Sequence, residues 1–219
     1  MMKLYSYFRS SASYRVRIAL NLKGLPYEVV PVHLLKQGGE QLTSEYRKLN
    51  ADGLVPALVD DTGESTAVLT QSLAIIEYLE ERHPEPRLLP QAATDRAYVR
   101  GIALSIACDI HPLNNLRVLR YLVRELNVNE GAKDTWYRHW CEQGLAAIES
   151  TLAKDGRSGM YCFGDTPSLA DCCLIPQIAN AQRLNCDLSD MPTIMRINQN
   201  CLALDAFVNA APAKQPDAE

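Results

Sequence analysis

The chain has 219 residues, which is long enough for one large domain or two smaller ones with a substantial core. Its residues are 47% hydrophobic and 22% charged, as in an ordinary globular protein, and its formal net charge of −4 disfavours binding to nucleic acid or an anionic membrane. No apolar run reaches membrane-spanning length, and the first residues predict a strand instead of a signal peptide. We therefore expect a cytoplasmic protein with neither nucleic acid nor membrane as a partner.

The seven cysteines and four histidines show no pattern of a disulfide framework or a metal site. The cysteines are odd in number and scattered, and they contain no C-x-x-C pair. The histidines lack metal-ligand spacing with cysteines or acids. We expect mostly buried, inert thiols and no bound metal.

The first elements predicted in chain order are a strand at 4–7 and an amphipathic helix that follows it and ends at 23–24. Three serines lie where the strand gives way to the helix. The first N–H groups of a helix have no intrahelical partner and carry partial positive charge, so they favour an anion, and a serine hydroxyl adds a donor. The alternative is that Ser10, Ser11 or Ser13 only caps the helix.

The rest of the first half continues with short strands and helices. Pro31 places the next strand at a sheet edge, because it cannot donate a ladder hydrogen bond. Ser72 is expected to cap the last helix, which stops near His83. The predicted elements are a strand at 27–33, an irregular helix at 41–49, strands at 54–59 and 67–69, and a helix from 72. Their β-α-β-α-β-β-α order is that of the thioredoxin-like fold.

Beyond these elements strand signals vanish and prolines recur, which predicts a linker. Long amphipathic segments follow at 95–108, 113–126 and 135–153, with shorter helical pieces at 194–201 and 204–210. We therefore divide the chain into a thioredoxin-like domain at 1–83, a linker at 84–94 and an all-helical domain at 95–219. The predicted fold class is α/β plus all-α.

Two local features of the second half are also predicted. Ser168 and Asp171 have the spacing of a capping box, which indicates the start of a buried helix. The polar tail at 213–219 is expected to be mobile unless it docks on the rest of the protein.

Several segments, in order along nearly the whole chain, are similar to the zeta class of glutathione transferases, the family of maleylacetoacetate and maleylpyruvate isomerases. The matching segments are 5–24, Val55-Pro56, 71–79, 87–90, 164–165, 169–171 and 215–217. The resemblance implies a glutathione transferase fold, in which a thioredoxin-like domain binds glutathione and the helical domain carries most of the second-substrate pocket. It also implies a homodimer.

Glutathione is the cofactor that the resemblance implies. Ser10 and Ser11 match serines that face its sulfur, and a hydroxyl hydrogen bond together with the helix N-terminus favours the thiolate; we assign the main role to Ser10. The other residues that the resemblance assigns to the cofactor site are Ala12, Ser13, Tyr14, Arg15, Gln41, Val55, Pro56, Gln71, Ser72, His111, Asn115, Leu116 and Arg117.

Some of these matches carry a specific implied role. Pro56 is expected to be cis, so that the Val55 backbone pairs with the cysteinyl part of glutathione. Gln71 and Ser72 would hold the γ-glutamyl end at a helix N-terminus, and Gln41 would lie near the glycyl end.

The segment from His111 to Arg117 is placed beside glutathione by the resemblance. His111 and Asn115 match residues next to the cofactor, and Arg117 would add a cation. The alternative is that His111-Pro112 only breaks a helix.

Arg9 and Arg183 match family arginines that suit an acidic substrate. The implied reaction turns a cis double bond between carbonyl groups into the trans isomer: the thiolate adds, the resulting single bond rotates, and glutathione is eliminated unchanged. Because addition develops an enolate-like charge on a dicarboxylic keto acid, fixed cations are needed. For an arbitrary arginine, a solvated surface role would be the default.

The resemblance implies conversion of maleylacetoacetate to fumarylacetoacetate in tyrosine and phenylalanine breakdown. Alternatives are isomerisation of maleylpyruvate, a broader transferase activity on α-haloacids, and a non-catalytic glutathione-binding module. One residue departs from the family pattern, since Ala12 stands where cysteine is usual. Without that thiol no mixed disulfide with glutathione forms there, which argues against thiol transfer and a glutaredoxin-like oxidoreductase.

Overall fold

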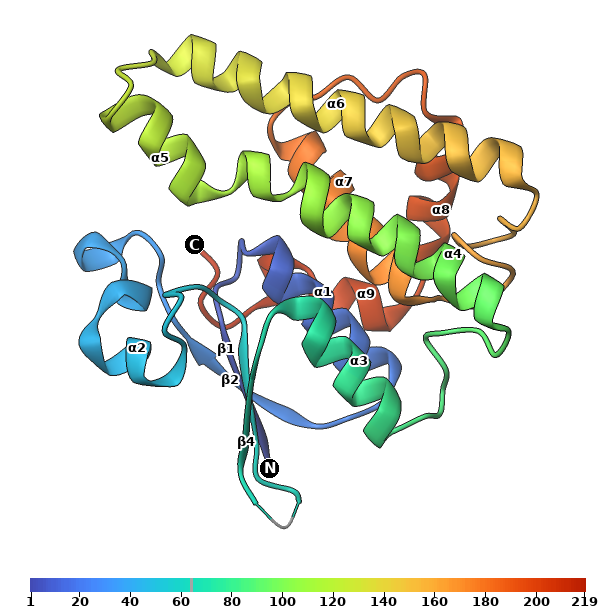
Figure 1. The fold of residues 1–219 in the computed structure, drawn as a ribbon, viewed down its shortest axis with the longest axis horizontal. Coiled ribbons are helices and arrows are strands. Elements are labelled where there is room, and N and C mark those ends of the chain that lie inside the picture. Colours follow the sequence, from blue (N-terminus) through green and yellow to red (C-terminus); the bar gives the residue numbers. More distant parts are fainter. Residues whose placement is uncertain (64) are drawn as a thin grey trace. The chain divides into compact units, whose positions relative to one another are not determined.

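The computed structural model describes residues 1–63 and 65–219, and these residues form two compact units (Figure 1). Unit 1 comprises Met1–Leu88 and Ala203–Glu219, and unit 2 comprises Leu89–Leu202. The sequence placed everything after residue 94 in the helical domain. The compact units differ from this division at the C-terminus, because helix α9 (Asp205–Ala210) packs with helix α1 (Ser11–Leu22) of unit 1 and Asp217 of the tail accepts from the Phe8 N–H.

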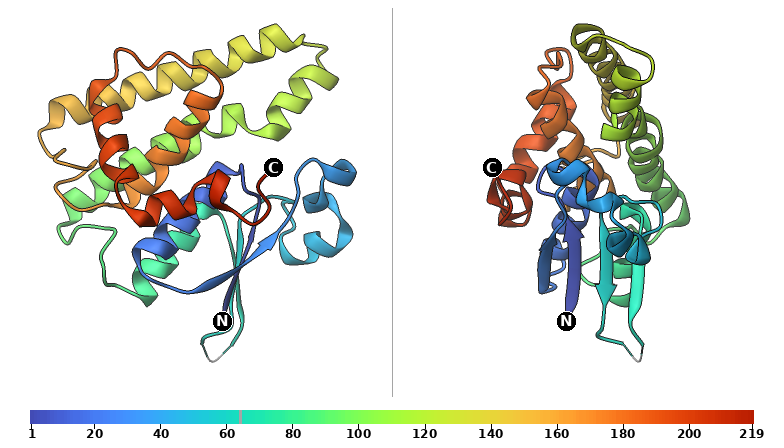
Figure 2. Two further views of the ribbon diagram at one scale, coloured as in Figure 1. Left: turned by 180° about the vertical axis from the view of Figure 1, so that it is seen from behind. Right: turned by 90° about the vertical axis from the view of Figure 1, so that its left-hand side faces the viewer.

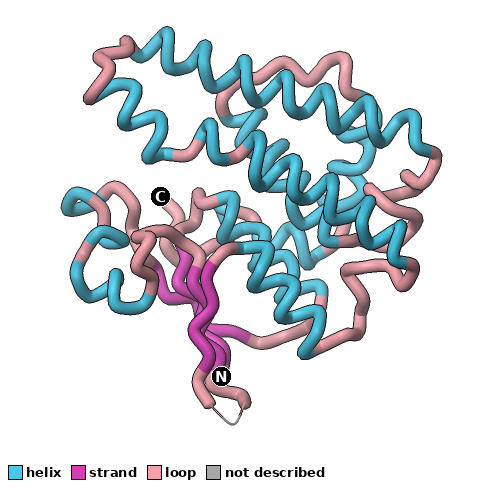
Figure 3. Tube along the Cα trace, viewed as in Figure 1, coloured by secondary structure: helices cyan, strands magenta, loops and turns pink. Residues whose placement is uncertain are grey.

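Unit 1 is built on a sheet of four strands in the order β2-β1-β3-β4 (Figure 3). The strands are β1 (Met2–Ser6), β2 (Tyr27–Pro31), β3 (Ala57–Asp60) and β4 (Ala67–Thr70). β1 runs parallel to β2 and antiparallel to β3, which is antiparallel to β4. As Pro31 predicted, β2 lies at an edge of the sheet.

Three helices flank this sheet. α1 and α3 (Ser72–Arg82) pack against each other on one side of the strands, and α2 (Ser44–Leu49) lies on the other (Figures 1 and 2). The helix prediction at 72 is correct, but Ser72 is its first helical residue and not its N-cap. Gln71 takes the capping position, with a left-handed φ of 66°.

Helix α1 is buried on more than one face. Val16, Ile18 and Leu20 are 0% exposed, as expected for its apolar residues. Arg15 and Arg17, which alternate with Val16 and Ile18 in the sequence, are buried as well. The pattern did not show this because α9, which packs on α1, comes from the opposite end of the chain.

Unit 2 is helical throughout its regular elements. α4 (Ala93–Leu104) continues through a π-helical turn at Ser105–Ile110 and a 3₁₀ turn at Pro112–Asn114 to α5 (Leu116–Arg124). The remaining helices are α6 (Glu130–Asp155), α7 (Leu169–Arg183) and α8 (Pro192–Leu202). In Figure 1, α5 lies beside the first part of α6. Among the described residues, no helix is long and apolar enough to span a membrane.

The predicted capping box begins α7, the most buried helix of unit 2. The Ser168 N–H and hydroxyl both donate to the Asp171 carboxylate at 2.8 Å, and the Cys162 N–H donates to it at 2.9 Å. Asp171 is 0% exposed, so these donors replace the water that its carboxylate loses on burial. The capping-box prediction is confirmed.

Candidate functional site

Ser10 lies at the N-terminus of α1, in the turn that leaves β1. Its N–H donates to the Tyr7 carbonyl at 2.9 Å, and its Oγ accepts from the Ser13 N–H at 3.2 Å. Of the three serines that the sequence offered as a helix cap, Ser10 is therefore the N-cap. Its hydroxyl hydrogen, however, has no acceptor among the described residues, so the same side chain keeps a donor for an anion at the helix end.

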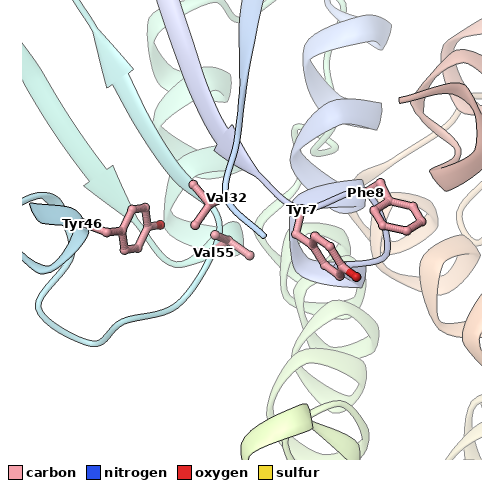
Figure 4. Close-up of a cluster of buried hydrophobic side chains, with 5 residues drawn as sticks. All are labelled: Tyr7, Phe8, Val32, Tyr46 and Val55. Atoms are coloured by element: carbon pink, nitrogen blue, oxygen red, sulfur yellow. The ribbon is translucent and has the colours of Figure 1, made fainter. Parts of the chain in front are cut away.

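The turn before Ser10 is anchored in an apolar cluster. Figure 4 shows Tyr7 and Phe8 at the end of β1, with Val32 and Val55 between Tyr7 and Tyr46 of α2. The rings of Tyr7 and Phe8 meet edge to face, with centroids 4.7 Å apart. This packing fixes the backbone that leads to Ser10.

Arg17 supports the same turn from inside the protein. Its guanidinium donates to the Phe8 carbonyl at 3.1 Å, to the Ser6 hydroxyl at 3.0 Å and to the Ala210 carbonyl at 2.8 Å. Burial lowers the pKa of Arg17 to about 10, which still leaves it charged at neutral pH. Sequence reasoning missed this residue, although an arginine flanked by Val16 and Ile18 in a buried helix was a signal.

Arg15 connects the start of α1 to the start of α3. Its Nη1 donates to the Ser72 Oγ at 3.2 Å, and both side chains are buried. Gln71 precedes Ser72 with φ 66° and ψ 115°, a conformation that side-chain-bearing residues rarely adopt. Two predicted cofactor residues are thus in contact, and a strained residue stands beside them.

Two further predicted segments of unit 1 have polar groups that lack a partner among the described residues. The Val55–Pro56 peptide bond is cis, as the resemblance implied, and no hydrogen bond among the described residues occupies the Val55 N–H or carbonyl. Gln41 is buried, and its Oε1 has no partner among the described residues. A Cβ at Gly39, whose φ is 113°, would lie 2.7 Å from the Gln41 amide, so only glycine leaves room for this side chain.

The remaining predicted residues around Ser10 differ in burial and in their partners. The Tyr14 hydroxyl donates to the Phe207 carbonyl of α9 at 3.2 Å. Ser13 is 0% exposed, with an Oγ that lacks a partner among the described residues. Ser11 is buried, Ala12 is half-buried, and Arg9 is exposed, with its guanidinium 4.8 Å from the centre of the Phe8 ring.

In unit 2, the segment before α5 brings two predicted side chains together. His111 Nε2 and Asn115 Nδ2 lie 3.4 Å apart, and the Asn115 side chain also caps α5 by accepting from the Arg117 N–H. Arg117 itself is exposed, and Leu116 is half-buried as the first residue of α5. The helix break that His111-Pro112 predicted is present, so that interpretation and the functional one are compatible.

Arg183 is the last residue of α7 and is exposed. Burial raises the pKa of the Tyr137 phenol, and the nearby Arg183 charge partly opposes this shift. The Tyr137 carbonyl also accepts from Asn114 Nδ2 at 3.1 Å. Tyr137 is thus a neighbour of two predicted site segments, and sequence reasoning did not single it out.

Comparisons with known proteins show the family to which this chain belongs. The family model for the glutathione S-transferase N-terminal domain matches residues 4–87, and that for the C-terminal domain matches residues 141–192. A probable maleylacetoacetate isomerase of Vibrio cholerae is 51% identical over 98% of this chain and 97% of its own. A maleylpyruvate isomerase of a Ralstonia species is 50% identical over 99% of both chains, and the mouse maleylacetoacetate isomerase is 49% identical over 98% of this chain and 94% of its own.

Solved structures give the same result. The holo structure of a maleylpyruvate isomerase, described as a bacterial zeta-class glutathione S-transferase, has a TM-score of 0.93 at 49% identity and covers 99% of this chain and 100% of its own. A maleylacetoacetate isomerase from Anaeromyxobacter dehalogenans with bound glutathione has a TM-score of 0.90 at 43% identity, covering 100% and 98%. The sheet of unit 1 and the helical unit 2 are thus those of a glutathione S-transferase. Within that class, the chain belongs to the zeta-class family of maleylacetoacetate and maleylpyruvate isomerases.

Proposed function

We propose that this protein is a glutathione-dependent cis–trans isomerase that converts maleylacetoacetate to fumarylacetoacetate in tyrosine and phenylalanine catabolism. The observation that carries the proposal is Ser10, a helix N-cap that retains a free hydroxyl hydrogen at the positive end of α1. Relatives named probable maleylacetoacetate isomerase and maleylacetoacetate isomerase, which are 51% and 49% identical over nearly the full chain, support the choice of substrate.

The polar groups of unit 1 fit glutathione. A thiolate suits the N-terminus of α1, where Ser10 and Ser11 add hydroxyls. The unoccupied main-chain groups of Val55 suit the peptide of the cysteinyl residue, and the α3 N-terminus at Gln71-Ser72 suits a carboxylate. Gln41, whose buried Oε1 lacks a partner in the described chain, offers an amide for the remaining end of the ligand.

When bound, glutathione supplies a thiolate that adds reversibly to an activated cis double bond and so lets that bond rotate. The chain's own residues make this possible. Ser10 donates a hydrogen bond to the sulfur and, with the helix N–H groups, lowers the pKa of the thiol. Arg9 and Arg183 bind the carboxylates of the keto acid and stabilise the charge that develops on its carbonyl. His111, Asn115 and Arg117 orient the bound molecules.

Maleylpyruvate is the second candidate substrate, because a relative at 50% identity is a maleylpyruvate isomerase. Both substrates present a cis alkene between carbonyl groups and differ mainly at the end remote from it. Displacement of halide from α-haloacids would use the same thiolate. A non-catalytic glutathione-binding module would not need the substrate cations Arg9 and Arg183.

The decisive experiment measures turnover of maleylacetoacetate and maleylpyruvate side by side, each with and without glutathione. We expect glutathione-dependent turnover with a higher kcat/KM for maleylacetoacetate. A higher kcat/KM for maleylpyruvate would make maleylpyruvate isomerisation the assigned activity. Glutathione binding without turnover of either compound would overturn the isomerase proposal in favour of a conjugating transferase or a binding module.

We place this activity in the cytoplasm, where the glutathione pool is kept reduced. The homodimer implied by the family resemblance belongs to the same proposal. Light scattering during gel filtration should give twice the mass of the 24.4 kDa chain. A mass equal to that of one chain would reject the dimer.

A further inference from the structure

The C-terminal tail folds back onto unit 1 and is fixed there by its own hydrogen bonds. Gln215 is buried, and its Nε2 donates to the carbonyls of Asn209 and Ala211, each at 3.0 Å. The Ala218 N–H closes a turn on the Gln215 carbonyl at 3.1 Å. The tail that the sequence left open as mobile or docked is therefore docked, and Asp217 lies within its turn.

Asp217 contacts the backbone that leads to the catalytic serine. Its Oδ2 accepts from the Phe8 N–H at 3.0 Å. On the other side of the same residue, the Phe8 carbonyl accepts from Arg17 at 3.1 Å. Both polar groups of Phe8 are thus held by charged side chains, and charge-assisted hydrogen bonds of this kind are stronger than neutral ones.

The same network reaches Ser10. The Tyr7 carbonyl accepts from the Ser10 N–H at 2.9 Å and from Arg17 at 3.5 Å. Asp217 also acts electrostatically on Arg17, since its negative charge favours the charged guanidinium. The tail, the buried arginine and the turn from Tyr7 to Ser10 therefore form one connected set of contacts within unit 1.

We propose that Asp217 is a positioning residue for Ser10: through the Phe8 N–H it fixes the turn that sets where the Ser10 hydroxyl points. This inference rests on the proposed function, in which Ser10 stabilises the thiolate. A displacement of about 1 Å at a catalytic group costs on the order of 100-fold in rate, so a contact at Phe8, two residues before Ser10 in the Tyr7–Ser10 turn, matters for the chemistry.

The test compares three variants at two tail positions. Asp217→Ala removes the acceptor of the Phe8 N–H, whereas Asp217→Asn keeps an oxygen of the same reach without the charge. Glu219→Gln is the matched control, because Glu219 belongs to the same tail but pairs with Lys36 and His33 instead of the turn. Three properties are measured. They are the hydrogen exchange rate of the Phe8 amide without glutathione, the pKa of the thiol of bound glutathione from thiolate absorbance, and kcat.

We expect Asp217→Ala to speed exchange of the Phe8 amide at least about tenfold, raise the pKa of the bound thiol, and lower kcat by about 10- to 100-fold. Asp217→Asn should recover most of the loss in kcat, and Glu219→Gln should match the unsubstituted chain. KM for the acid substrate should change little, since Asp217 does not bind it.

The inference is overturned if Asp217→Ala leaves the bound-thiol pKa and the Phe8 exchange unchanged. It is also overturned if Asp217→Asn, folded at the assay temperature, loses as much kcat as Asp217→Ala. Failure of the proposed function is distinguishable, because the unsubstituted protein would then bind and ionise glutathione without isomerising either substrate. The exchange and thiol measurements would still decide the role of Asp217.

Discussion

In the proposed mechanism, Ser10 performs two tasks with one hydroxyl, because the tasks use different parts of it. Its oxygen accepts from the Ser13 N–H and so caps α1, while its hydrogen remains available to an anion. Capping and thiolate stabilisation therefore depend on the same side-chain orientation.

Substitution of Ser10 by alanine should lower turnover by about 10- to 100-fold, because a hydrogen bond to a charged sulfur is lost. The folded state should lose only about 1 kcal/mol, the value of one N-cap. Steady-state kinetics and thermal unfolding measure both effects. Ser11→Ala is the matched control, and a larger loss of kcat in that variant would assign the thiolate to Ser11.

Substitution of Arg183 by alanine should raise KM for the acid substrate more than KM for glutathione, because in the proposed mechanism this cation binds a substrate carboxylate. Arg183→Lys should recover part of the affinity, since it keeps the charge without the planar fork. Arg124→Ala, at an exposed position of α5, serves as the control. Equal effects of Arg183→Ala on both KM values would remove Arg183 from the substrate site.

Among single residues, the local pattern predicted that Ser10, Ser11 or Ser13 caps α1, and the family resemblance predicted the cis Pro56. Neither predicted that Arg17 would become the buried support of the turn. Its partners are main-chain carbonyls of Phe8 and Ala210, which carry no side-chain signature in a sequence. Asp217 was part of the resemblance, but its contact with Phe8 joins the two ends of the chain and has no local signal.

Asp60 joins three elements of unit 1 at the end of β3. Its carboxylate accepts from the Thr62 N–H at 2.8 Å and the Thr62 hydroxyl at 2.6 Å, both in the turn towards β4. It also accepts from the Tyr78 hydroxyl of α3 at 2.8 Å. The helix that presents Gln71 and Ser72 is thus fastened to the sheet through one carboxylate.

This carboxylate makes the stability of the fold depend on pH. Burial alone would raise the pKa of Asp60, but the donors on Thr62 and Tyr78, together with Arg82, hold it below its ordinary value. Since the folded-state pKa is depressed, the contribution of Asp60 is complete above its unfolded pKa of about 4 and is lost as the pH falls through the lower folded value.

We therefore expect the free energy of unfolding of the unsubstituted chain to fall more steeply below about pH 4 than that of Asp60→Asn. The variant should be less stable at neutral pH by about 1–3 kcal/mol, because an amide is a weaker acceptor for these donors. Urea unfolding across the acidic range measures the difference. Parallel curves for the two proteins would show that another group controls the acid dependence. Asp61→Asn, at the exposed neighbouring position, is the control.

At the scale of elements, helices and strands were predictable where the hydrophobic residues had a regular period, or where a proline or a capping residue marked an edge or an end. α1, the edge strand containing Pro31 and the capping box of α7 are examples. The start of α3 was less predictable, because serine favours the N-cap position in general and Gln71 occupies it only in a left-handed conformation. Tertiary contacts, not local preference, hold such a residue in place.

At the scale of the whole molecule, unit 1 carries the groups that fit glutathione. They come from α1, from the segment around Gln41, from the Val55-Pro56 step and from the start of α3. Lys23 ties the ends of α1 and α3 together, since its Nζ donates to Glu80 and to the carbonyl of His83, both at 2.7 Å. Because these elements are linked to one another, we expect glutathione to stabilise the whole of unit 1 against unfolding.

Glutathione at about 100 times its dissociation constant should add about 2.7 kcal/mol to the stability of the folded state. For a chain of this length, that corresponds to a rise of about 5–10 °C in melting temperature. Ser72→Ala should reduce the rise, whereas Ser10→Ala should keep most of it because the other contacts of the ligand remain. The absence of any rise with the unsubstituted chain would contradict the assignment of glutathione.

The fold class and the order of elements were predictable from the sequence, because they follow from alternating and helical patterns along the chain. The division into units was not, since the sequence gives no local sign that residues 203–219 belong with residues 1–88. Only packing between segments distant in the chain, such as α9 on α1, reveals it.

This discontinuous first unit has a consequence for synthesis on the ribosome. The acceptors that Tyr14 and Arg17 find on α9, the carbonyls of Phe207 and Ala210, are made only after all of unit 2 has been translated. Until then a guanidinium destined for the interior lacks one of its partners, so the nascent N-terminal segment cannot reach its final form. Residues 203–219, which follow unit 2 in the chain, therefore complete the unit that residues 1–88 begin.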